Sequence, residues 1–400
     1  MKFGVFYEHQ LPRPWDDGSE RRLYDEALEQ VVLADRLGVD YVWEVEHHFL
    51  EEYSHSSAPE VFLAACAART EDIRLGHGIK LTPPAYNHPA RTAEQVATLD
   101  VVSDGRVEFG TGESGSTMEL DAFGVAVEDK YEMWQEATRE ACEMMASEPY
   151  PGYEGEFFEM PARNVVPKPV QEPHPPLWMA CPSREMIEVA ARHGVGALCF
   201  AFRSPDEAAG WVERYHEVFR EECVPIGRSV NPRVAMTTGF SCHEDGDVAV
   251  ERGKEGFDFF RWALAYYYVF GSHQPGFDSL WEEYEDGPDE LPSLAETAIG
   301  TPRELRETFE RYAEAGVDQM ILVGQGGKTS HEHICDGLRL FADEVMPEFH
   351  EGEEERVRAK REELEPAVQR AFERKDERPP ASREDVEAVK PYDRDYSNYL

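Results

Sequence analysis

Residues 23–48, LYDEALEQVVLADRLGVDYVWEVEHH, contain one complete helix-to-strand unit. Apolar residues spaced three or four positions apart predict the buried face of a helix: Leu23, Ala27, Val31, Ala34 and Leu37. Gly38 then ends the helix, because glycine tolerates the left-handed backbone found at many helix ends. The run 39–45 is rich in Val, Tyr and Trp and predicts a buried strand, which leads into the polar sequence EHH at 46–48.

Strand-like and helix-like periods alternate along most of the chain. Eight strand-like runs are present, at residues 3–7, 39–45, 73–81, 106–110, 177–181, 195–202, 233–241 and 317–323. Eight such units predict an α/β fold, a (β/α)8 TIM barrel over residues 1–350, with an open doubly wound sheet as the alternative. The long stretches 149–176 and 262–299 are expected to form lids.

Residues 351–400 form a separate, highly charged extension. Acidic and basic residues alternate in its first part, and the few apolar positions are Val357, Leu364, Val368 and Phe372. This pattern predicts a helix that lies on the barrel or on a neighbouring subunit. A less ordered end is expected from residue 379 onward.

The overall charge excludes several classes of partner. The chain has 81 acidic and 40 basic residues and a formal charge of -41, and only nine of the basic residues are lysines. Such a surface disfavours nucleic acid and anionic membranes. No apolar run reaches the ~20 residues of a membrane span, and no signal-peptide pattern is present, so we expect a cytoplasmic protein. Because salt screens self-repulsion, a halophilic protein is predicted, with an ordinary acidic enzyme as the alternative.

Cysteine and histidine spacing gives little support for a metal site. The seven cysteines are scattered and never form a C-x-x-C pair, so free thiols are expected. His331 and Cys335 would share a helical face beside Glu332 and His333, but no fourth ligand is evident. The start of a helix is the favoured interpretation of this segment, and a metal site is the alternative.

The candidates for chemistry lie at the carboxyl ends of the strands, where a (β/α)8 barrel places its active site. Glu46, His47 and His48 follow the second strand. Two histidines beside a carboxylate can supply an acid or base near neutral pH and can stabilise a developing anion. Histidines with a purely structural role at the strand end are the alternative.

Two further strand ends are suited to binding a ligand. Residues 110–115, GTGESG, match G-x-G-x-x-G, but the first β-α unit lacks this loop. Close approach of a ring or phosphate is therefore favoured over a Rossmann turn or a plain tight turn. Ser183 and Arg184 open a helix after the fifth strand, which predicts either a phosphate cradle or an ordinary N-cap serine.

Several short motifs occur in the order found in one enzyme family. They are KFGVF at 2–6, Trp43 with EHHF at 46–49, LTP at 81–83, HPAR at 88–91, SDGR at 103–106, FGTG at 109–112, VPKPVQ at 166–171, PPLW at 175–178, GTP at 300–302 and VMP at 345–347. Across residues 1–350 this combination resembles the bacterial luciferase-like, flavin-dependent monooxygenases.

The resemblance implies an oxidoreductase that uses reduced FMN and O2, through a peroxyflavin, to oxidise a small organic substrate such as an aldehyde, ketone or alkene. A separate flavin reductase would supply the reduced FMN, and a homo-oligomer is expected. The implied catalytic residue is His47, oriented by Glu46 and His48. A non-proline cis peptide bond is expected at Gly78–Ile79. The candidate cofactor-binding residues are Gly78, Ile79, Thr111, Gly112, Cys181, Ser183 and Arg184.

Two positions depart from the family pattern. Glu113 stands where an arginine near the flavin phosphate is common, and Tyr131, beside Lys130, occupies another usually basic position. Arg184 is the predicted compensating cation and could pair with Glu113. These departures favour the alternative of a barrel that binds flavin without turnover. The resemblance also implies a second alternative, hydride transfer with a deazaflavin coenzyme, which the same family uses.

An aromatic stretch is expected to cover the site. Its members are Tyr266, Tyr267, Tyr268, Phe270 and Trp281. A lid made of these residues would exclude water from the reaction. An ordinary core or a subunit interface is the alternative interpretation.

Overall fold

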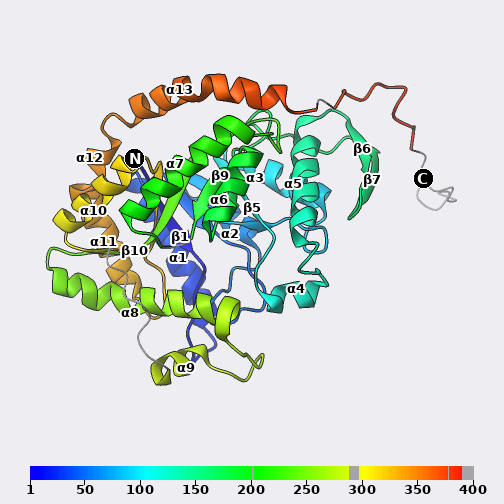
Figure 1. The fold of residues 1–400 in the computed structure, drawn as a ribbon. Coiled ribbons are helices and arrows are strands. Elements are labelled where there is room, and N and C mark those ends of the chain that lie inside the picture. Colours follow the sequence, from blue (N-terminus) through cyan, green and yellow to red (C-terminus); the bar gives the residue numbers. More distant parts are fainter. Residues whose placement is uncertain (201, 288–296, 377, 390–400) are drawn as a thin grey trace.

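The computed structural model describes residues 1–200, 202–287, 297–376 and 378–389, and its centre is a closed barrel of parallel strands (Figure 1). The strands follow one another around the barrel as β1 (Lys2–Tyr7), β2 (Tyr41–Glu44), β3 (Arg74–His77), β5 (Val107–Gly112), β8 (Leu177–Ala180), β9 (Gly196–Cys199), β10 (Val234–Cys242) and β12 (Gln319–Val323). The ring closes because β12 pairs in parallel with β1, and β9 with β10. The predicted barrel is confirmed, and the open sheet is excluded.

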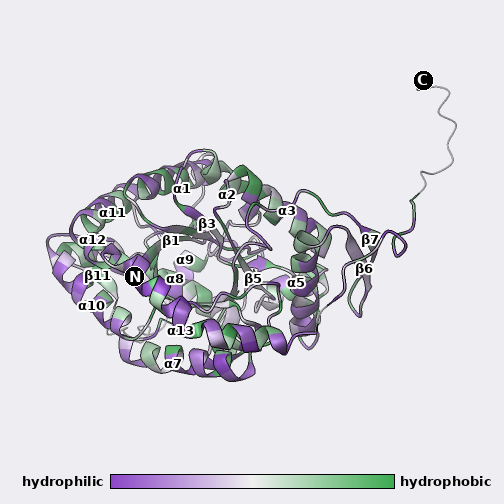
Figure 2. Cartoon of the chain, turned by 90° about the horizontal axis from the view of Figure 1, so that it is seen from above, coloured by the Kyte–Doolittle hydropathy of each residue, from purple (hydrophilic) through white to green (hydrophobic). Residues whose placement is uncertain are grey.

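Helices surround the barrel, as the view from above shows (Figure 2). They are α1 (Ser19–Arg36), α2 (Pro59–Ala67), α3 (Pro89–Val102), α4 (Thr117–Phe123), α5 (Lys130–Ala146), α6 (Arg184–His193), α7 (Pro205–Glu222), α8 (Gly246–Ala265), α9 (Leu280–Asp286), α10 (Pro302–Glu314), α11 (His331–Glu344), α12 (Met346–His350) and α13 (Glu353–Glu373). Gly38 has a φ of 82° just after α1, as its predicted capping role requires. In the described ranges, no helix is long and apolar enough to cross a membrane.

Two tryptophans fill the interior of the barrel. The rings of Trp43 on β2 and Trp178 on β8 meet edge to face, with centroids 5.4 Å apart. Glycine is needed beside each ring, because a Cβ at Gly76 would lie 2.2 Å from Trp43 and one at Gly196 would lie 2.4 Å from Trp178. The barrel is therefore a packed core, and ligands must bind at its ends.

The stretch 149–176 does not cover the mouth. It contains an antiparallel hairpin of β6 (Tyr150–Glu154) and β7 (Glu159–Arg163), which lies beside α5 on the outer wall (Figure 1). Glu136 on α5 holds the hairpin, because its carboxylate accepts the backbone N–H groups of residues 156–158. An insertion between a helix and the next strand emerges at the amino ends of the strands, so this segment cannot act as the expected lid.

The second long stretch does reach the mouth. After α8 the chain forms a π-helix, η1 (Tyr266–Phe270), followed by α9. The short strand β11 (Ala298–Gly300) then pairs with the end of β10. Residues 288–296 of the predicted lid lie outside the described residues.

The charged extension folds onto its own barrel. Helix α13 lies across the end of the molecule that carries the N-terminus (Figure 1). Lys360 contacts both carboxylate oxygens of Asp318, just before β12, at 2.7 Å, and Arg378 pairs with Glu140 on α5 at 2.8 Å. The predicted helix is present, and of the two surfaces considered it occupies the barrel.

Candidate functional site

A histidine lies between two buried carboxylates at the carboxyl ends of the strands. His47 follows β2, Glu8 follows β1 and Glu119 lies on α4. The Nδ1 atom of His47 is 3.1 Å from Oε1 of Glu119, and its Nε2 atom is 3.7 Å from Oε2 of Glu8. All three residues are at most 5% exposed. The arrangement holds the imidazole ring by one nitrogen and leaves the other facing Glu8.

Glu119 is fixed by several donors. Its Oε1 atom also accepts the backbone N–H of His48 at 2.8 Å, and its Oε2 atom accepts the hydroxyl of Ser114 at 2.5 Å. Ser114 adopts a φ of 65°, and this left-handed turn after β5 leads the chain into α4. Because its carboxylate accepts several hydrogen bonds, Glu119 can remain ionised while buried.

The electrostatics of this triad favour a charged histidine. Burial opposes the charge of His47, but the carboxylates of Glu119 and Glu8 outweigh burial and raise the His47 pKa to about 9. Burial alone would raise the pKa of Glu119, but His47 and the hydrogen-bond donors around the Glu119 carboxylate keep that pKa below its usual value. Burial raises the pKa of Glu8 to about 7, despite the nearby His47. An ionised Glu119, a protonated His47 and a titrating Glu8 therefore coexist near neutral pH.

Glu46 and His48 form a neighbouring pair and do not contact the ring of His47. The Oε1 atom of Glu46 is 3.3 Å from Nε2 of His48 and accepts the side-chain N–H of Asn87 at 2.9 Å. Its Oε2 atom accepts the backbone N–H of Leu81 at 2.8 Å. The predicted orienting role of Glu46 and His48 thus falls instead to Glu119, which contacts Nδ1 of His47.

Sequence reasoning missed Glu8 and Glu119 for different reasons. Glu8 comes directly after the first strand, so the rule that pointed to His47 could have found it as well. Glu119 is 72 residues away from His47 along the chain, on a helix that follows a glycine-rich turn. The spacing of these residues along the chain does not predict that contact.

The glycine-rich end of β5 serves strand packing. A Cβ at Gly110 would lie 2.0 Å from the carbonyl oxygen of His77, so glycine lets β5 approach β3. The hydroxyl of Thr111 donates to the carbonyl of Trp178 at 3.1 Å and accepts the indole N–H of Trp134 at 3.0 Å. Gly112 packs on Ile79, because a Cβ there would meet its side chain at 3.0 Å. The hydroxyl of Thr111 therefore forms its hydrogen bonds within the protein. These contacts do not support the hypothesis that residues 110–115 form a dinucleotide-binding turn.

The cis peptide bond expected between Gly78 and Ile79 is absent. Within the described residues, the cis peptide bonds all precede proline, so this bond is trans and the prediction was wrong. The neighbouring backbone N–H of Gly78 donates to the carbonyl of Glu44 at 2.6 Å. The trans form also avoids the ~3–4 kcal/mol cost of a non-proline cis bond. Ile79 itself is 8% exposed and packs with the aromatic residues of the mouth.

The end of β8 differs from expectation at two residues. Cys181 is fully buried in the outer core, where its thiol faces the carbonyl of Met179 at 3.3 Å, so it cannot line a cofactor site. Ser183 caps α6 by accepting the backbone N–H of Met186 at 3.4 Å. Arg184 is exposed, and the cation beside Glu113 is Lys130, at 2.8 Å. The predicted pairing of Arg184 with Glu113 is therefore replaced by a pairing with Lys130.

Aromatic side chains cover the triad. The ring of Tyr268 on η1 meets the His47 ring edge to face at 6.3 Å, and a Cβ at Gly115 would lie 2.8 Å from Tyr268. The hydroxyl of Tyr53 donates to Glu8 at 2.9 Å. Trp281 is only 3% exposed, whereas Phe270 is 55% exposed. Part of the predicted aromatic stretch thus closes the mouth, and part of it faces solvent.

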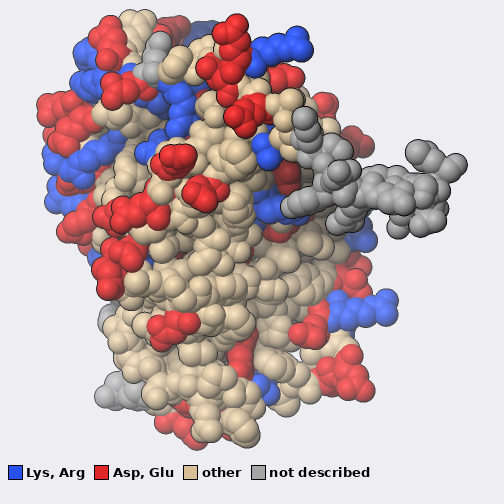
Figure 3. Space-filling model, turned by 90° about the vertical axis from the view of Figure 1, so that its right-hand side faces the viewer, with Lys and Arg blue, Asp and Glu red and all other residues tan. Residues whose placement is uncertain are grey.

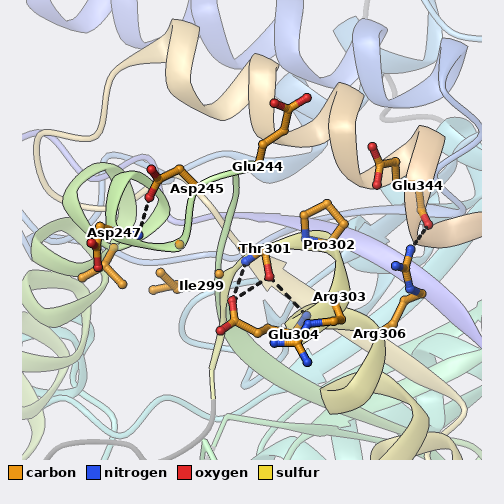
Figure 4. Close-up of a pocket in the computed structure, with 13 residues that line it drawn as sticks. Glu244, Asp245, Asp247, Ile299, Thr301, Pro302, Arg303, Glu304, Arg306 and Glu344 are labelled. Carbon is orange, nitrogen blue, oxygen red and sulfur yellow. Dashed lines mark hydrogen bonds between the residues drawn. The ribbon is translucent and has the colours of Figure 1, made fainter.

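A cavity of about 730 Å³ elsewhere does not bear on this chemistry. It lies between the starts of α8 and α10 (Figure 4), where the carboxylates already serve the helix ends. Asp245 accepts the backbone N–H of Asp247 at 2.9 Å, and Glu304 forms the predicted capping box with Thr301. These caps account for Asp245, Thr301 and Glu304, and Arg306 donates to the backbone carbonyl of Glu344 at 2.7 Å.

The segment 331–335 begins a helix, as favoured from the sequence. His331 opens α11 behind the cap residue Ser330, and its Nε2 atom lies 3.7 Å from the thiol of Cys335. Within the described part of the chain, no group of three or more His, Cys, Asp or Glu side chains is arranged to hold a metal ion. The segment therefore has a structural explanation.

Comparison with known proteins identifies the family. The chain is 27% identical to the oxygenase component of the flavin-dependent trigonelline monooxygenase of Acinetobacter baylyi, over 90% of this chain and 98% of that protein. It is 24% identical to an F420-dependent glucose-6-phosphate dehydrogenase of Amycolatopsis mediterranei, over 80% and 93%. The crystal structure of the monooxygenase RslO1 from Streptomyces bottropensis superposes with a TM-score of 0.71 at 26% identity, over 87% of this chain and 100% of that one. The luciferase-like monooxygenase family model matches residues 1–319. The chain therefore belongs to the luciferase-like monooxygenase family.

Proposed function

We propose that this enzyme is the oxygenase of a two-component monooxygenase, which uses reduced FMN and O2 to oxidise a small organic substrate. The observation that carries the proposal is the buried His47 held between the carboxylates of Glu8 and Glu119 at the barrel mouth. The relative from Acinetobacter baylyi, named as an oxygenase component, supports a separate flavin reductase as a transient partner. Assembly into a homo-oligomer is part of the same proposal.

The residues around His47 fit a cofactor with a flat ring and polar edges. Glu8 Oε2 and Ser116 Oγ are buried and have no hydrogen-bond partner in the structure. Buried polar atoms normally have one, so donors and acceptors at the edge of a bound ring would satisfy them. Ile79 and Tyr268 offer apolar surface beside them. The start of α6 at Ser183, with Arg184 exposed next to it, is suited to the phosphate. A bound reduced FMN would supply two electrons for the reaction with O2.

His47 would act as the proton donor. Its pKa of about 9 keeps the ring protonated at neutral pH, and Glu119 holds the Nδ1 proton. The Nε2 proton faces Glu8 across 3.7 Å, which is longer than a hydrogen bond. That proton is available to an oxygen anion that develops on a reactant in the mouth. Glu8, with a pKa of about 7, can return a proton to His47 between turnovers.

The aromatic cover would keep water away from the reacting groups. Tyr268 lies over the His47 ring, and Tyr53 is 1% exposed and bonded to Glu8. Exclusion of water strengthens the electrostatic interactions within the mouth and protects reactive species from hydrolysis. Movement of η1 would then be required for a substrate to enter.

Hydride transfer with a deazaflavin coenzyme is the second candidate function. The F420-dependent relative favours it, since that protein matches over most of its length. The same His47 could serve as acid or base in hydride transfer, so the triad does not separate the two chemistries. The third alternative, a barrel that binds flavin without turnover, loses its main argument because Lys130 neutralises Glu113.

Equilibrium binding followed by reaction with O2 tests the proposal. The purified protein, in molar salt and without oxygen, is titrated with reduced FMN and separately with reduced F420. We expect saturable binding of reduced FMN. On mixing with O2, the wild type should release hydrogen peroxide slowly, and His47→Gln should release it at least about tenfold faster because the mouth loses the cation that stabilises the reduced oxygen anion there.

A matched variant and three outcomes make the test decisive. His243→Gln changes a histidine that bonds to Asp245 near the start of α8, so its peroxide release should equal that of the wild type. Binding of reduced F420 without binding of reduced FMN would establish the hydride-transfer function instead. Binding of neither coenzyme, or equal peroxide release by the wild type and His47→Gln, would refute the proposal.

A further inference from the structure

A second cavity lies at the opposite end of the barrel from His47. It has a volume of about 640 Å³ and is enclosed by α13 and the amino ends of the strands. Arg233 and Asp318 stand just before β10 and β12, and Leu364 lies on α13. The volume falls in the range of small-molecule sites. Because the interior of the barrel is packed, this cavity is separate from the mouth.

The lining of this floor cavity is basic, although the protein as a whole is acidic. Three carboxylates line it, from Asp318, Glu353 and Glu365. The basic side chains in the lining are Arg228, Arg233, Arg356, Lys360 and Arg361. In the chain overall, acidic residues outnumber basic ones by 81 to 40. On the face drawn in Figure 3, the upper part, which is the α13 end of Figure 1, carries Lys and Arg side chains interspersed with Asp and Glu. A local reversal of charge attracts anions.

Two of these cations form no ion pair with a carboxylate among the described residues. Arg233 donates to the hydroxyl of Tyr41 at 3.3 Å, and no carboxylate in the described ranges forms an ion pair with it. Arg361 on α13 likewise forms no ion pair with any described residue. Lys360, in contrast, is held by both oxygens of Asp318. The carboxylates of Glu108 and Asp318 act on Arg233 only at longer range, so Arg233 and Arg361 are the groups that can form a direct ion pair with an anionic head group.

Apart from Ser229 and Asn231, the rest of the lining is mostly apolar. Valine and leucine side chains supply it: Val230, Val317, Val357, Leu364 and Val368. Helix α13 is fully buried at only three of its 21 residues, Leu364, Ala367 and Ala371, so it covers the floor without filling the space beneath it. A bare inorganic ion would occupy a small part of this volume, since a water molecule takes ~30 Å³. The basic and apolar side chains of the lining, together with the volume of the cavity, suit a ligand that has both an anionic group and a hydrocarbon part.

We propose that the floor cavity is a second ligand site, which binds an amphiphilic organic anion such as a medium-chain carboxylate. The carboxylate bonds to Arg233 and Arg361, and the hydrocarbon lies against Val317 and Leu364. The site is independent of the proposed oxygenase chemistry, because it shares no residue with the mouth.

Calorimetric titration of the whole protein with octanoate tests this proposal. The KCl concentration is the lowest that retains the fold, since salt screens the head-group contacts. Octanoate should bind saturably, and 1-octanol, which has the same chain length without the charge, should bind at least about tenfold more weakly. Arg361→Gln should weaken octanoate binding about fivefold, the usual effect of one exposed charge pair.

Two control variants locate the binding. Arg370→Gln removes the same charge from an exposed position of α13 outside the cavity lining and should bind octanoate like the wild type. His47→Gln should also bind it normally, because the mouth lies at the other end of the barrel. Absence of saturable binding would overturn the proposal. Equal octanoate binding by Arg361→Gln and Arg370→Gln would also overturn it, as would binding of inorganic phosphate as tight as that of octanoate. Loss of octanoate binding in His47→Gln would overturn it too, because that result would place octanoate in the mouth.

Discussion

The substitution Glu119→Gln should lower the pKa of His47 by about two units. The carboxylate of Glu119 lies 3.1 Å from Nδ1 of His47. At an effective dielectric constant of ~20, a charge pair at this distance interacts by ~5 kcal/mol. If relaxation and the remaining Glu8 offset about half of that energy, the loss is about 2.7 kcal/mol, or about 2 pKa units. The His47 pKa should therefore fall from about 9 to about 7.

Nuclear magnetic resonance of ¹⁵N-labelled histidines across a pH series measures this shift. The spectrum of His47→Gln assigns the His47 signals by their absence. Glu60→Gln is the matched control, because Glu60 pairs with Lys80 at 3.3 Å and is not among the groups that raise the His47 pKa. An His47 pKa in Glu119→Gln within about 0.3 units of the wild-type value would refute the assignment of Glu119 as the main electrostatic partner.

Three further substitutions or conditions have definite expected effects. Gly110→Ala should lower the free energy of unfolding by about 2–4 kcal/mol, because its Cβ would lie 2.0 Å from the His77 carbonyl oxygen. Gly210→Ala is the control: a Cβ there has open space on α7, so this variant should raise the free energy of unfolding by ~0.5–1 kcal/mol. Equal denaturation midpoints for the two variants would contradict this. Burial lowers the pKa of His174 to about 4, so its contribution to stability is present above pH ~6.5 and is lost as pH falls. His174→Gln should therefore reduce the rise of unfolding free energy with pH between about 4 and 6.5 by about 1.4 kcal/mol per pH unit, and an unchanged slope in denaturant titrations would exclude this linkage. Circular dichroism should show the fold melting at lower temperature when KCl falls from about 2 M to about 0.1 M, and full stability in low salt would remove the case for salt adaptation.

The barrel could be predicted because its strands are buried on both sides. Strands in such a sheet form apolar runs between amphipathic helices, and each of the eight runs contains a strand in the structure. Boundaries were less predictable where the backbone changes direction. The run 73–81 is divided into β3 and β4 (Lys80–Leu81), and the run 195–202 ends as a strand at Cys199. The break in the first of these runs falls at Gly78 and Ile79, beside the mouth.

The candidate site was predictable only in part, because its charges come from three separate elements. His47 could be identified from its place after an apolar strand. The partner that fixes its ring lies on α4, and the turn before α4 depends on the left-handed backbone of Ser114. Serine does not favour that conformation as glycine does, so the sequence carries no clear signal for it. Contacts of this kind depend on tertiary structure, which periodicity does not describe.

The departure at Glu113 is explained by its neighbour in space. An unpaired carboxylate beside a cofactor phosphate would be unfavourable, and this argued for a barrel without activity. The ammonium group of Lys130 contacts Glu113 at 2.8 Å and also donates to the carbonyl of Ser114 at 2.7 Å. The pair is neutral as a unit and ties the start of α5 to the turn that carries α4. Since that turn also positions Glu119, the acidic residue at 113 helps to hold the triad of His47, Glu8 and Glu119 in place. Under the proposed function, the phosphate would then depend on the start of α6 and on the exposed Arg184, whose charge also interacts with the neighbouring Glu185.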